Sequence, residues 1–273
     1  MAKRVRVKPL DSFEEFEKLL HIQRVVWKHG DIDLTPVHQF VVSSRMGGIL
    51  LGAFVGPELA GFVYSFPAVF KGESCQHSHL LAVLPDFQGF GLGKALKWAQ
   101  REEALKRGYR VVTWTFDPLQ TRNANLNLQA LGAVSRTYFP NFYGMVPALC
   151  LGPGIPTDRM LIEWPIRDRR VKARFEGKAR RPACDTGALP KALERRIGGK
   201  DPFHLPGRPN LRLDAEAVLV EVPRDIKALA GRPDLSAEWQ TGLRRTMTAY
   251  FGRGYVADHF LFGDRAFYVL KKS

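Results

Sequence analysis

A chain of 273 residues, of which 45% are hydrophobic and 25% are charged, is long enough for one large globular domain or two smaller ones. It contains no apolar run near the ~18–20 residues of a membrane span and opens without the apolar block of a signal peptide, so we expect a cytoplasmic protein with no membrane partner. Its net charge of +14 indicates anionic partners.

The three cysteines, Cys75, Cys150 and Cys184, are far apart and form no C-x-x-C pair. Neither a disulfide framework nor a zinc site is therefore indicated. We expect the cysteines to be small buried side chains, and we expect the protein to bind no metal.

The first part of the chain alternates strand and helix patterns. A strand is expected over residues 4–8, and the capping-box pattern Ser12-Phe-Glu-Glu15 opens a helix. A second helix is expected from Pro36 to Gly47, before a β-hairpin over residues 49–55 and 61–66. The apolar face of the first helix is expected to include Phe13, Phe16, Leu19 and Leu20.

A glycine-rich loop lies at the centre of this pattern. A strand over residues 79–84 leads into Asp86–Gly93, and the helix that follows ends at Gly108. In that helix one face is apolar, and Lys94, Lys97 and Arg101 share another. The elements expected next are a strand over residues 111–116, a short helix over 124–131, and strands over 133–138 and 159–164.

Positive charge is concentrated between Ile166 and Arg212, where 14 basic residues stand against five acidic ones. This segment is rich in Pro and Gly, so we expect a long connection with at most short helices. The expected domains are therefore a body over residues 1–165, a basic connection over 166–212 and a C-terminal α/β piece over 213–273. That piece reads as a strand, a helix from Ser236 and a hairpin.

Three glycines, at positions 89, 91 and 93, precede a helix whose unpaired first-turn N–H groups suit a phosphate. A Walker A loop is excluded, because Gln88 stands at its first glycine and Ala95 where a magnesium-binding hydroxyl is needed. A dinucleotide fingerprint fails because Lys94 replaces its third glycine. The pattern that fits is Gln-x-x-Gly-x-Gly, formed by Gln88, Gly91 and Gly93.

This pattern resembles the acyl-CoA loop of the GNAT acetyltransferase superfamily, Gln/Arg-x-x-Gly-x-Gly/Ala. The resemblance runs from Leu80–Leu96 through the next strand to Asn123-Ala124 and Leu131-Gly132. It implies a GNAT fold of the α/β (α+β) class, in which helices flank a mixed twisted sheet with a splayed central strand pair. Four further segments resemble a GNAT subfamily with chains of about this length: Ser78–Val83, Trp114–Ala124, Asn141–Gly144 and Thr157–Arg159.

The resemblance also implies a binding site for acetyl-CoA or another acyl-CoA. Backbone amides from Gly89 to Lys94 would bind the pyrophosphate, and a bulge near Leu81–Val83 would free main-chain groups for the pantetheine and the thioester carbonyl. Asn123 would lie beside the pantetheine arm, or would cap a helix instead. The cofactor-binding residues implied are Leu81, Ala82, Val83, Gln88, Gly89, Phe90, Gly91, Leu92, Gly93, Lys94 and Asn123.

Acyl transfer to an amine acceptor needs a base to take the proton of the amine and an acid to help the thiolate leave. GNAT enzymes often place a tyrosine acid four residues before the Leu-Gly helix end, where this chain has Leu128. Tyr138 or Tyr143 could act instead, unless each is a packed aromatic. His79 and Glu73, on or just before the splayed strand, are the candidate bases, although a structurally hydrogen-bonded His79 is as good an interpretation.

The C-terminal piece echoes the back half of a GNAT domain without its glycine loop, so we expect a degenerate half that packs on the body or completes its sheet. Two functions remain: an N-acyltransferase, or a nucleic-acid-binding or regulatory protein that uses the basic segment. Nucleic-acid binders interleave aromatic and basic residues, but the basic segment has only Phe175 and Phe203. The sequence therefore favours the enzyme, and it leaves a monomer and a homodimer both open.

Overall fold

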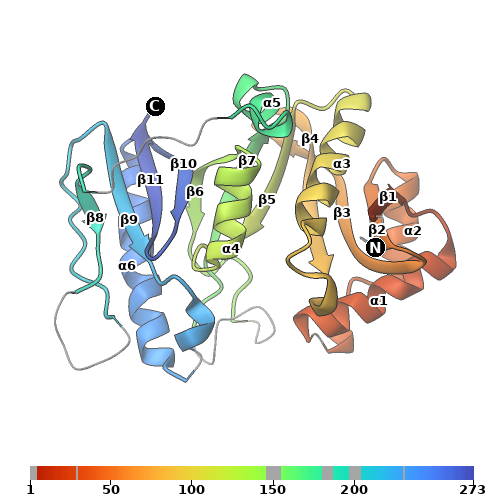
Figure 1. Ribbon diagram of the computed structural model, residues 1–273, viewed down its shortest axis with the longest axis horizontal. Coiled ribbons are helices and arrows are strands. Elements are labelled where there is room, and N and C mark those ends of the chain that lie inside the picture. The colour runs from red at the N-terminus through yellow and green to blue at the C-terminus, as the bar shows by residue number, and fades with distance from the viewer. Residues whose placement is uncertain (1–4, 29, 146–154, 180–186, 197–203, 230) are drawn as a thin grey trace. The chain divides into compact units, whose positions relative to one another are not determined.

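The computed structural model describes residues 5–28, 30–145, 155–179, 187–196, 204–229 and 231–273. The chain forms two compact units, residues 1–114 with 165–169 (unit 1) and residues 115–164 with 170–273 (unit 2). Figure 1 labels the helices and strands of both units. The chain passes between the units after Trp114, inside the strand Val111–Phe116, again after Trp164, one residue from the boundary expected at residue 165, and after Arg169. Cys75 is a buried free thiol, as expected, and Cys150 and Cys184 lie outside the described residues.

The sheet of unit 1 has the strand order β1-β2-β3-β4-β5. Strands β1 to β4 are antiparallel, and β4 and β5 are parallel. The bounds are β1 Val5–Pro9, β2 Ile49–Val55, β3 Glu58–Phe70, β4 Glu73–Val83 and β5 Val111–Phe116. Strands β3 and β4 extend well beyond the ranges expected, because they form one long hairpin whose turn places Lys71 and Gly72 at positive φ.

Helices α1 (Phe13–Trp27) and α2 (Val37–Arg45) cover one face of this sheet. Ser12 caps α1 as predicted, since its Oγ accepts a hydrogen bond of 3.2 Å from the amide of Glu15. Phe13 is 57% exposed, so its predicted place on the apolar face is wrong. The core between these helices and the sheet includes Phe16, Leu19, Ile22, Phe40, Phe62 and Tyr64.

Helix α3 (Leu92–Lys106) packs on the other face of the sheet, and its polar residues are not all at the surface. Lys97 and Arg101 are buried, whereas Lys94 is exposed. The side chain of Arg101 reaches the short segment 165–169, where its Nε donates a hydrogen bond of 2.8 Å to the carbonyl of Ile166. Helical spacing alone predicted that Lys94, Lys97 and Arg101 share one polar face. Lys97 and Arg101 are buried instead, because their side chains bind partners that are distant in the sequence.

The sheet of unit 2 has the order β7-β6-β10-β11-β9-β8. Strand β10 pairs with β6 at Ala257 and Ser135, so the C-terminal piece completes the sheet of β6 and β7, which is one of the two arrangements expected. The strand bounds are β6 Val134–Phe139, β7 Arg159–Pro165, β8 Lys191–Leu193, β9 Ala217–Val222, β10 Tyr255–Phe262 and β11 Ala266–Lys272.

The main helix of unit 2 is α6 (Pro233–Gly252), which begins three residues before the expected Ser236 because Pro233 is a favourable first-turn residue. It buries Leu235, Trp239, Leu243 and Met247, spaced by four residues. The remaining helical elements are η1 Asp31–Asp33, η2 Pro85–Phe87, α4 Thr121–Ala124, the π-helical turn η3 Asn125–Ala130, α5 Arg169–Phe175 and η5 Ile226–Leu229.

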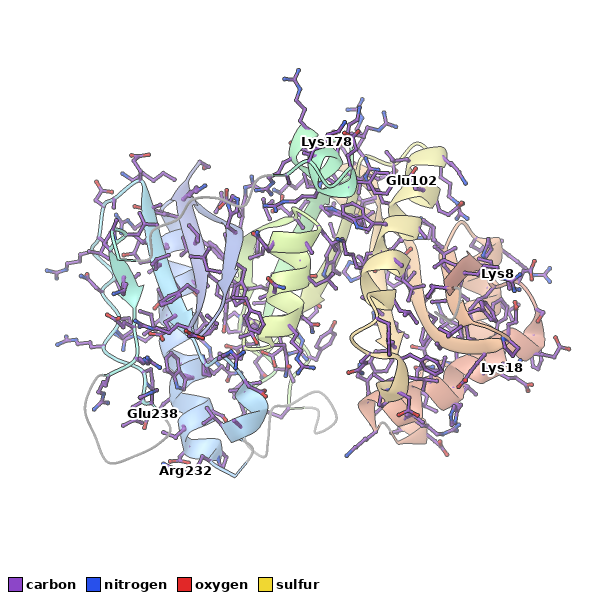
Figure 2. The ribbon with its side chains drawn as sticks, in the orientation of Figure 1. Lys8, Lys18, Glu102, Lys178, Arg232 and Glu238 are labelled. Carbon is purple, nitrogen blue, oxygen red and sulfur yellow. The ribbon has the colours of Figure 1, made fainter. Side chains whose placement is uncertain are left out.

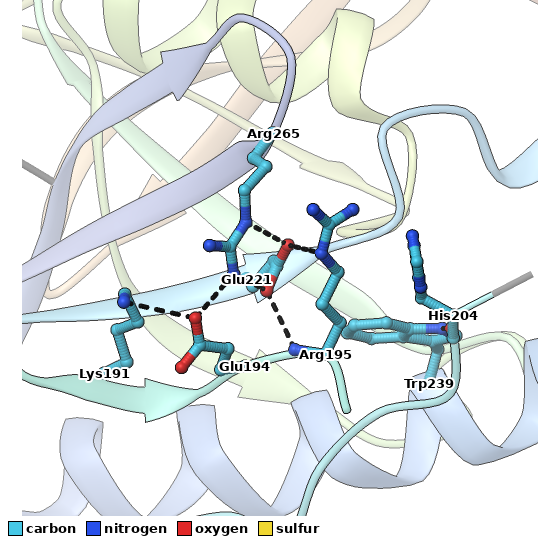
Figure 3. Close-up of polar contacts among 7 residues, drawn as sticks. All are labelled: Lys191, Glu194, Arg195, His204, Glu221, Trp239 and Arg265. Carbon is cyan, nitrogen blue, oxygen red and sulfur yellow. Dashed lines mark hydrogen bonds and ion pairs between the residues drawn. The ribbon is translucent and has the colours of Figure 1, made fainter. Parts of the chain in front are cut away.

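A charge network joins strands β8 and β9 of unit 2 to the turn between β10 and β11 (Figure 3). The carboxylate of Glu221 on β9 is buried and accepts a hydrogen bond of 2.8 Å from Arg265 Nε. Arg265 Nη2 also lies 2.7 Å from Glu194 Oε1, which pairs with Lys191 at 3.1 Å. This network anchors β8, an element the sequence did not predict.

Exposed charged side chains such as Lys18, Lys178 and Glu238 stand on the outside of their units (Figure 2). Within the described residues, no helix combines the length and the apolar character that crossing a bilayer requires.

Candidate functional site

The loop before α3 has the backbone conformation that its glycines allow. Gly89 and Gly91 have φ values of +86° and +78°, in the left-handed region that other residues rarely adopt. Gly91 is the N-cap of α3, and no side chain of the described residues caps the helix in its place. The amide of Ala95 is the first to donate back, to the Gly91 carbonyl at 3.0 Å. The amides of Leu92, Gly93 and Lys94 therefore have no acceptor within the helix.

The space in front of this loop is open. A Cβ atom built at Gly89, Gly91 or Gly93 would have no described atom within 4 Å. Phe90 and Lys94 are exposed, whereas the side chain of Leu92 is buried and only its amide can serve a ligand. Unpaired amides and the positive end of the helix dipole meet at this open face, which suits a bound anion such as a pyrophosphate.

Gln88 connects the loop to the end of β4. Its Nε2 donates a hydrogen bond of 3.0 Å to the carbonyl of Val83. Of the strand residues predicted to bind the cofactor, Ala82 is buried, and Leu81 and Val83 are half-buried. Gln88 thus fixes the loop to the strand, and the Val83 carbonyl is already an acceptor within the chain.

Strands β4 and β5 part beyond a short contact. Their parallel ladder consists of Gln76 with Val112 and His77 with Thr113, although β4 continues to Val83. Over that stretch the ladder between β4 and β3 goes on to Val83 and Gly61. One edge of β4 is therefore free of a strand partner from Ser78 onward, within residues that are all described. The splayed strand pair that the sequence predicted is present.

The irregularity in β4 falls at His79, because Tyr64 and Ser65 of β3 pair with Leu80 and Ser78. The predicted position, near Leu81–Val83, is therefore wrong by about two residues. An extra residue bends a strand locally and reorients its side chains. No local sequence pattern indicates the position of this extra residue in β4.

Two histidines lie beside the point where the strands part, on the face that α1 and α2 cover. His77 Nδ1 is 3.0 Å from Thr113 Oγ1, and the His77 ring centroid is 5.4 Å from that of Phe66. Desolvation, with help from His79 and Lys97, lowers the pKa of His77 to about 4. His79 is exposed but packs against Tyr64 and Phe66, and desolvation lowers its pKa. Both rings are therefore neutral at physiological pH.

A buried lysine lies on the opposite face of the same point. Lys97 of α3 is only 2% exposed, and its Nζ donates to Ser78 Oγ at 3.1 Å and to Gln100 Oε1 at 2.8 Å. Its Nζ is 3.6 Å from the ring centroid of Trp114. Desolvation lowers the pKa of Lys97 well below its usual value. The sequence reasoning missed this group, because nothing in the spacing of α3 separates a buried lysine from a solvated one.

Glu73 is not part of this site. It is the first residue of β4, exposed, and paired with Phe70 next to the hairpin turn. At about 3.3 Å per residue, six residues of strand separate it from His79 by about 20 Å. The expectation that Glu73 lies just before the splayed part of the strand is therefore wrong, because β4 begins much earlier than the pattern of residues 79–84 indicated.

Three predicted site residues belong to unit 2. Tyr138 is buried and donates a hydrogen bond of 2.7 Å to Asp158 Oδ2, and desolvation raises its pKa well above the usual value. It is therefore a weak acid committed to a structural contact. Tyr143 is half-buried, with its hydroxyl 3.0 Å from Thr115 Oγ1. Asn123 is exposed inside α4 and does not cap it, since the N-cap is Gln120.

Another acidic group at the end of β5 escaped the sequence reasoning. Asp117 directly follows the strand, and its Oδ1 accepts a hydrogen bond of 2.9 Å from the amide of Leu119. Desolvation raises the pKa of Asp117 to about 6.

Leu128, where the superfamily often has its tyrosine acid, is fully buried. Within the described residues, no group of three or more His, Cys, Asp or Glu is arranged to hold a metal ion.

The chain is similar to known proteins both in sequence and in fold. Residues 13–132 match the model of the family described as the acetyltransferase (GNAT) family. The sequence matches no curated protein.

Among solved structures, the yncA protein of Salmonella typhimurium, determined with its cofactor acetyl-CoA, is 17% identical, with a TM-score of 0.51 over 66% of this chain and 99% of that chain. The PaiA N-acetyltransferase of Thermoplasma acidophilum, in complex with coenzyme A, is 15% identical, with a TM-score of 0.45 over 59% of this chain and 99% of that chain.

A GNAT family acetyltransferase of Elizabethkingia anophelis, with acetyl-CoA bound, is 18% identical, with a TM-score of 0.46 over 59% of this chain and 97% of that chain. At these identities the likeness to the Salmonella structure shows a shared fold, and the family match locates the domain in the sequence. Residues 13–132 are therefore the part of the chain that matches the acetyltransferase (GNAT) family.

Proposed function

We propose that the protein is an acyl-CoA-dependent N-acyltransferase that transfers an acetyl group from acetyl-CoA to an amine. The observation that carries this proposal is the uncapped N-terminus of α3, which follows Gly89 and Gly91 at positive φ and adjoins the free edge of β4. The GNAT match over residues 13–132, and related structures with acetyl-CoA or coenzyme A bound, support the choice of ligand.

The amides from Gly89 to Lys94 would bind the pyrophosphate of coenzyme A, because those of Leu92, Gly93 and Lys94 have no acceptor within α3 and the three glycines of the loop adjoin open space. The main-chain groups of Leu81, Ala82 and Val83 would contact the pantetheine along the free edge of β4. Bound acyl-CoA supplies a thioester carbonyl for attack by the amine and a thiolate as leaving group. Asn123 remains a proposed contact of the pantetheine arm.

His79 is the proposed base. Desolvation keeps its imidazole neutral near pH 7, so that its nitrogen can accept the proton that the attacking amine loses. Tyr143 is the proposed acid, because its hydroxyl is less buried than that of Tyr138 and its hydrogen-bond partner is a hydroxyl rather than a carboxylate.

Calorimetry with coenzyme A and acetyl-CoA tests the binding step, and release of free thiol from acetyl-CoA in the presence of pooled amines tests the transfer. We expect saturable binding of both ligands and thiol release that depends on an amine. A protein that shows no heat of binding with either ligand would contradict the proposal. A titration with DNA at rising salt would separately reveal a nucleic-acid binder, whose affinity falls steeply with salt.

A further inference from the structure

The amine of Lys97 lies where strands β4 and β5 begin to separate, a point called the vertex of the opening between them. The last pair of the ladder is His77 with Thr113, so Ser78 and Trp114 are the first residues beyond it. Lys97 Nζ touches both, with a hydrogen bond of 3.1 Å to Ser78 Oγ and a distance of 3.6 Å to the Trp114 ring centroid. Gln100, one turn along α3, accepts a third contact at 2.8 Å and fixes the orientation of the amine.

The free edge of β4 has the length of an extended ligand arm. From Val83, next to the loop, to Ser78, at the vertex, the free edge of β4 runs for five residues, or about 16 Å at 3.3 Å per residue. A ligand anchored by its phosphates at Gly89–Lys94 and extended along this edge therefore brings its far end to the vertex. In acyl-CoA, that far end is the thioester.

Burial favours the nucleophilic form of this amine. Lys97 is 2% exposed, and desolvation disfavours its charged form. An exposed lysine, with an ordinary pKa of about 10.4, is almost entirely protonated at neutral pH and has no lone pair to donate. Lys106, at the other end of α3, is exposed and paired with Glu103 at 2.8 Å, so the same helix carries both kinds of lysine.

We propose that Lys97 is an autoacylation site, whose Nζ accepts the acyl group of an acyl-CoA bound by the same chain. This inference rests on the proposed function. The neutral amine attacks the thioester carbon, a C–N bond forms, and the C–S bond breaks with its electron pair on sulfur. The proton that the amine loses goes to the thiolate, so the products are an amide and free coenzyme A thiol.

The modification is limited to one acyl group per chain, because an amide is not a nucleophile. The acylated side chain fills the vertex where the next thioester would lie. Autoacylation is therefore self-limiting, and it is expected when acyl-CoA is present without an amine acceptor.

The test is incubation of the full chain with acetyl-CoA alone, followed by intact mass measurement and peptide mapping. We expect a mass increase of one acetyl group per chain, on the peptide that contains Lys97. Lys97→Arg should abolish the increase, whereas the matched control Lys106→Arg should leave it unchanged. Acetyl groups spread over exposed lysines, with Lys97 unmodified, would overturn the inference.

The pH dependence gives an independent readout. The rate of modification of Lys97 should reach its plateau at a lower pH than the slow chemical acetylation of exposed lysines, because its amine loses its proton more easily. Calorimetry with coenzyme A separates the two proposals. If the ligand binds and Lys97 stays unmodified, autoacylation fails and the proposed function stands, whereas absence of binding removes both. Should Lys97→Arg not fold, the peptide map of the unsubstituted chain decides.

Discussion

His77 Nδ1 lies 3.0 Å from Thr113 Oγ1, and this contact joins the last residue pair that β4 and β5 share. The two strands separate directly beyond it. Free main-chain groups of β4 and the imidazole of His79 follow within a few residues of His77, and the amine of Lys97 binds Ser78, the next residue along the strand. Its strength therefore bears on both the stability of unit 1 and the geometry of the opening.

Acidification should destabilise the protein through His77. The folded-state pKa of His77 is about 4, below its ordinary value. Between about pH 6.5 and pH 4 the unfolded chain therefore binds more protons than the folded chain, so the free energy of unfolding decreases as the pH is lowered. For a half-buried ring we expect a loss of about 1–2 kcal/mol. Urea unfolding across this range should show a shallower dependence for His77→Asn, which can still hydrogen-bond Thr113. The exposed His21→Asn should keep the original slope.

Gly91→Ala should weaken coenzyme A binding by at least tenfold. Gly91 has φ +78°, so an added Cβ costs about 1 kcal/mol of backbone strain and displaces the first-turn amides of α3. Gly108→Ala is the matched control, because Gly108 follows the other end of α3 with φ +83° and equally open space. Both variants should lose similar stability in thermal melts, and only Gly91→Ala should lose affinity in calorimetry. Equal affinities would remove the loop from the binding site.

His79→Ala should lower kcat for acetyl transfer by about 10²–10⁴-fold, the usual contribution of a general base. Tyr143→Phe should lower kcat less, by about tenfold, because thiolate is already a good leaving group.

Tyr138→Phe should instead cost about 1–3 kcal/mol of stability, because it removes a hydrogen bond from the buried Asp158. Steady-state kinetics and urea unfolding measure the two effects. Full activity in both His79→Ala and Tyr143→Phe would make the catalytic assignments wrong.

Arg265→Ala should destabilise unit 2 by about 3 kcal/mol, because it leaves the buried Glu221 without its main cationic partner. The amide of Arg195 still donates to Glu221 at 2.8 Å, which keeps the loss at the lower end of the usual range. Arg24→Ala breaks an exposed pair with Asp31 and should cost less than about 1 kcal/mol. Denaturant midpoints of the two variants compare a buried network with a surface pair, and similar losses would contradict the role assigned to Glu221.

Local patterns were enough to predict much of unit 1. The strand expected over residues 111–116 is β5 to the residue, and the helix after the glycine loop begins and ends close to its predicted bounds. Ser12 caps α1 as its spacing to Glu15 indicated. These features depend on neighbouring residues, since glycine conformation, capping and periodic burial are properties of a few consecutive positions. The identity of the ligand at the loop stays a prediction.

Only the tertiary structure decided which polar side chains are buried and where they meet. Lys97 lies beside Ser78 because α3 packs on the sheet, and Tyr138 meets Asp158, which Arg244 binds from 86 residues away. The bulge at His79 and the distant position of Glu73 depend on the pairing of β3 with β4. The sequence by itself determined the GNAT pattern and its glycine loop, because these are local. Desolvation and long-range hydrogen bonds, which fix the pKa and orientation of each reactive group, exist only once the distant segments have packed.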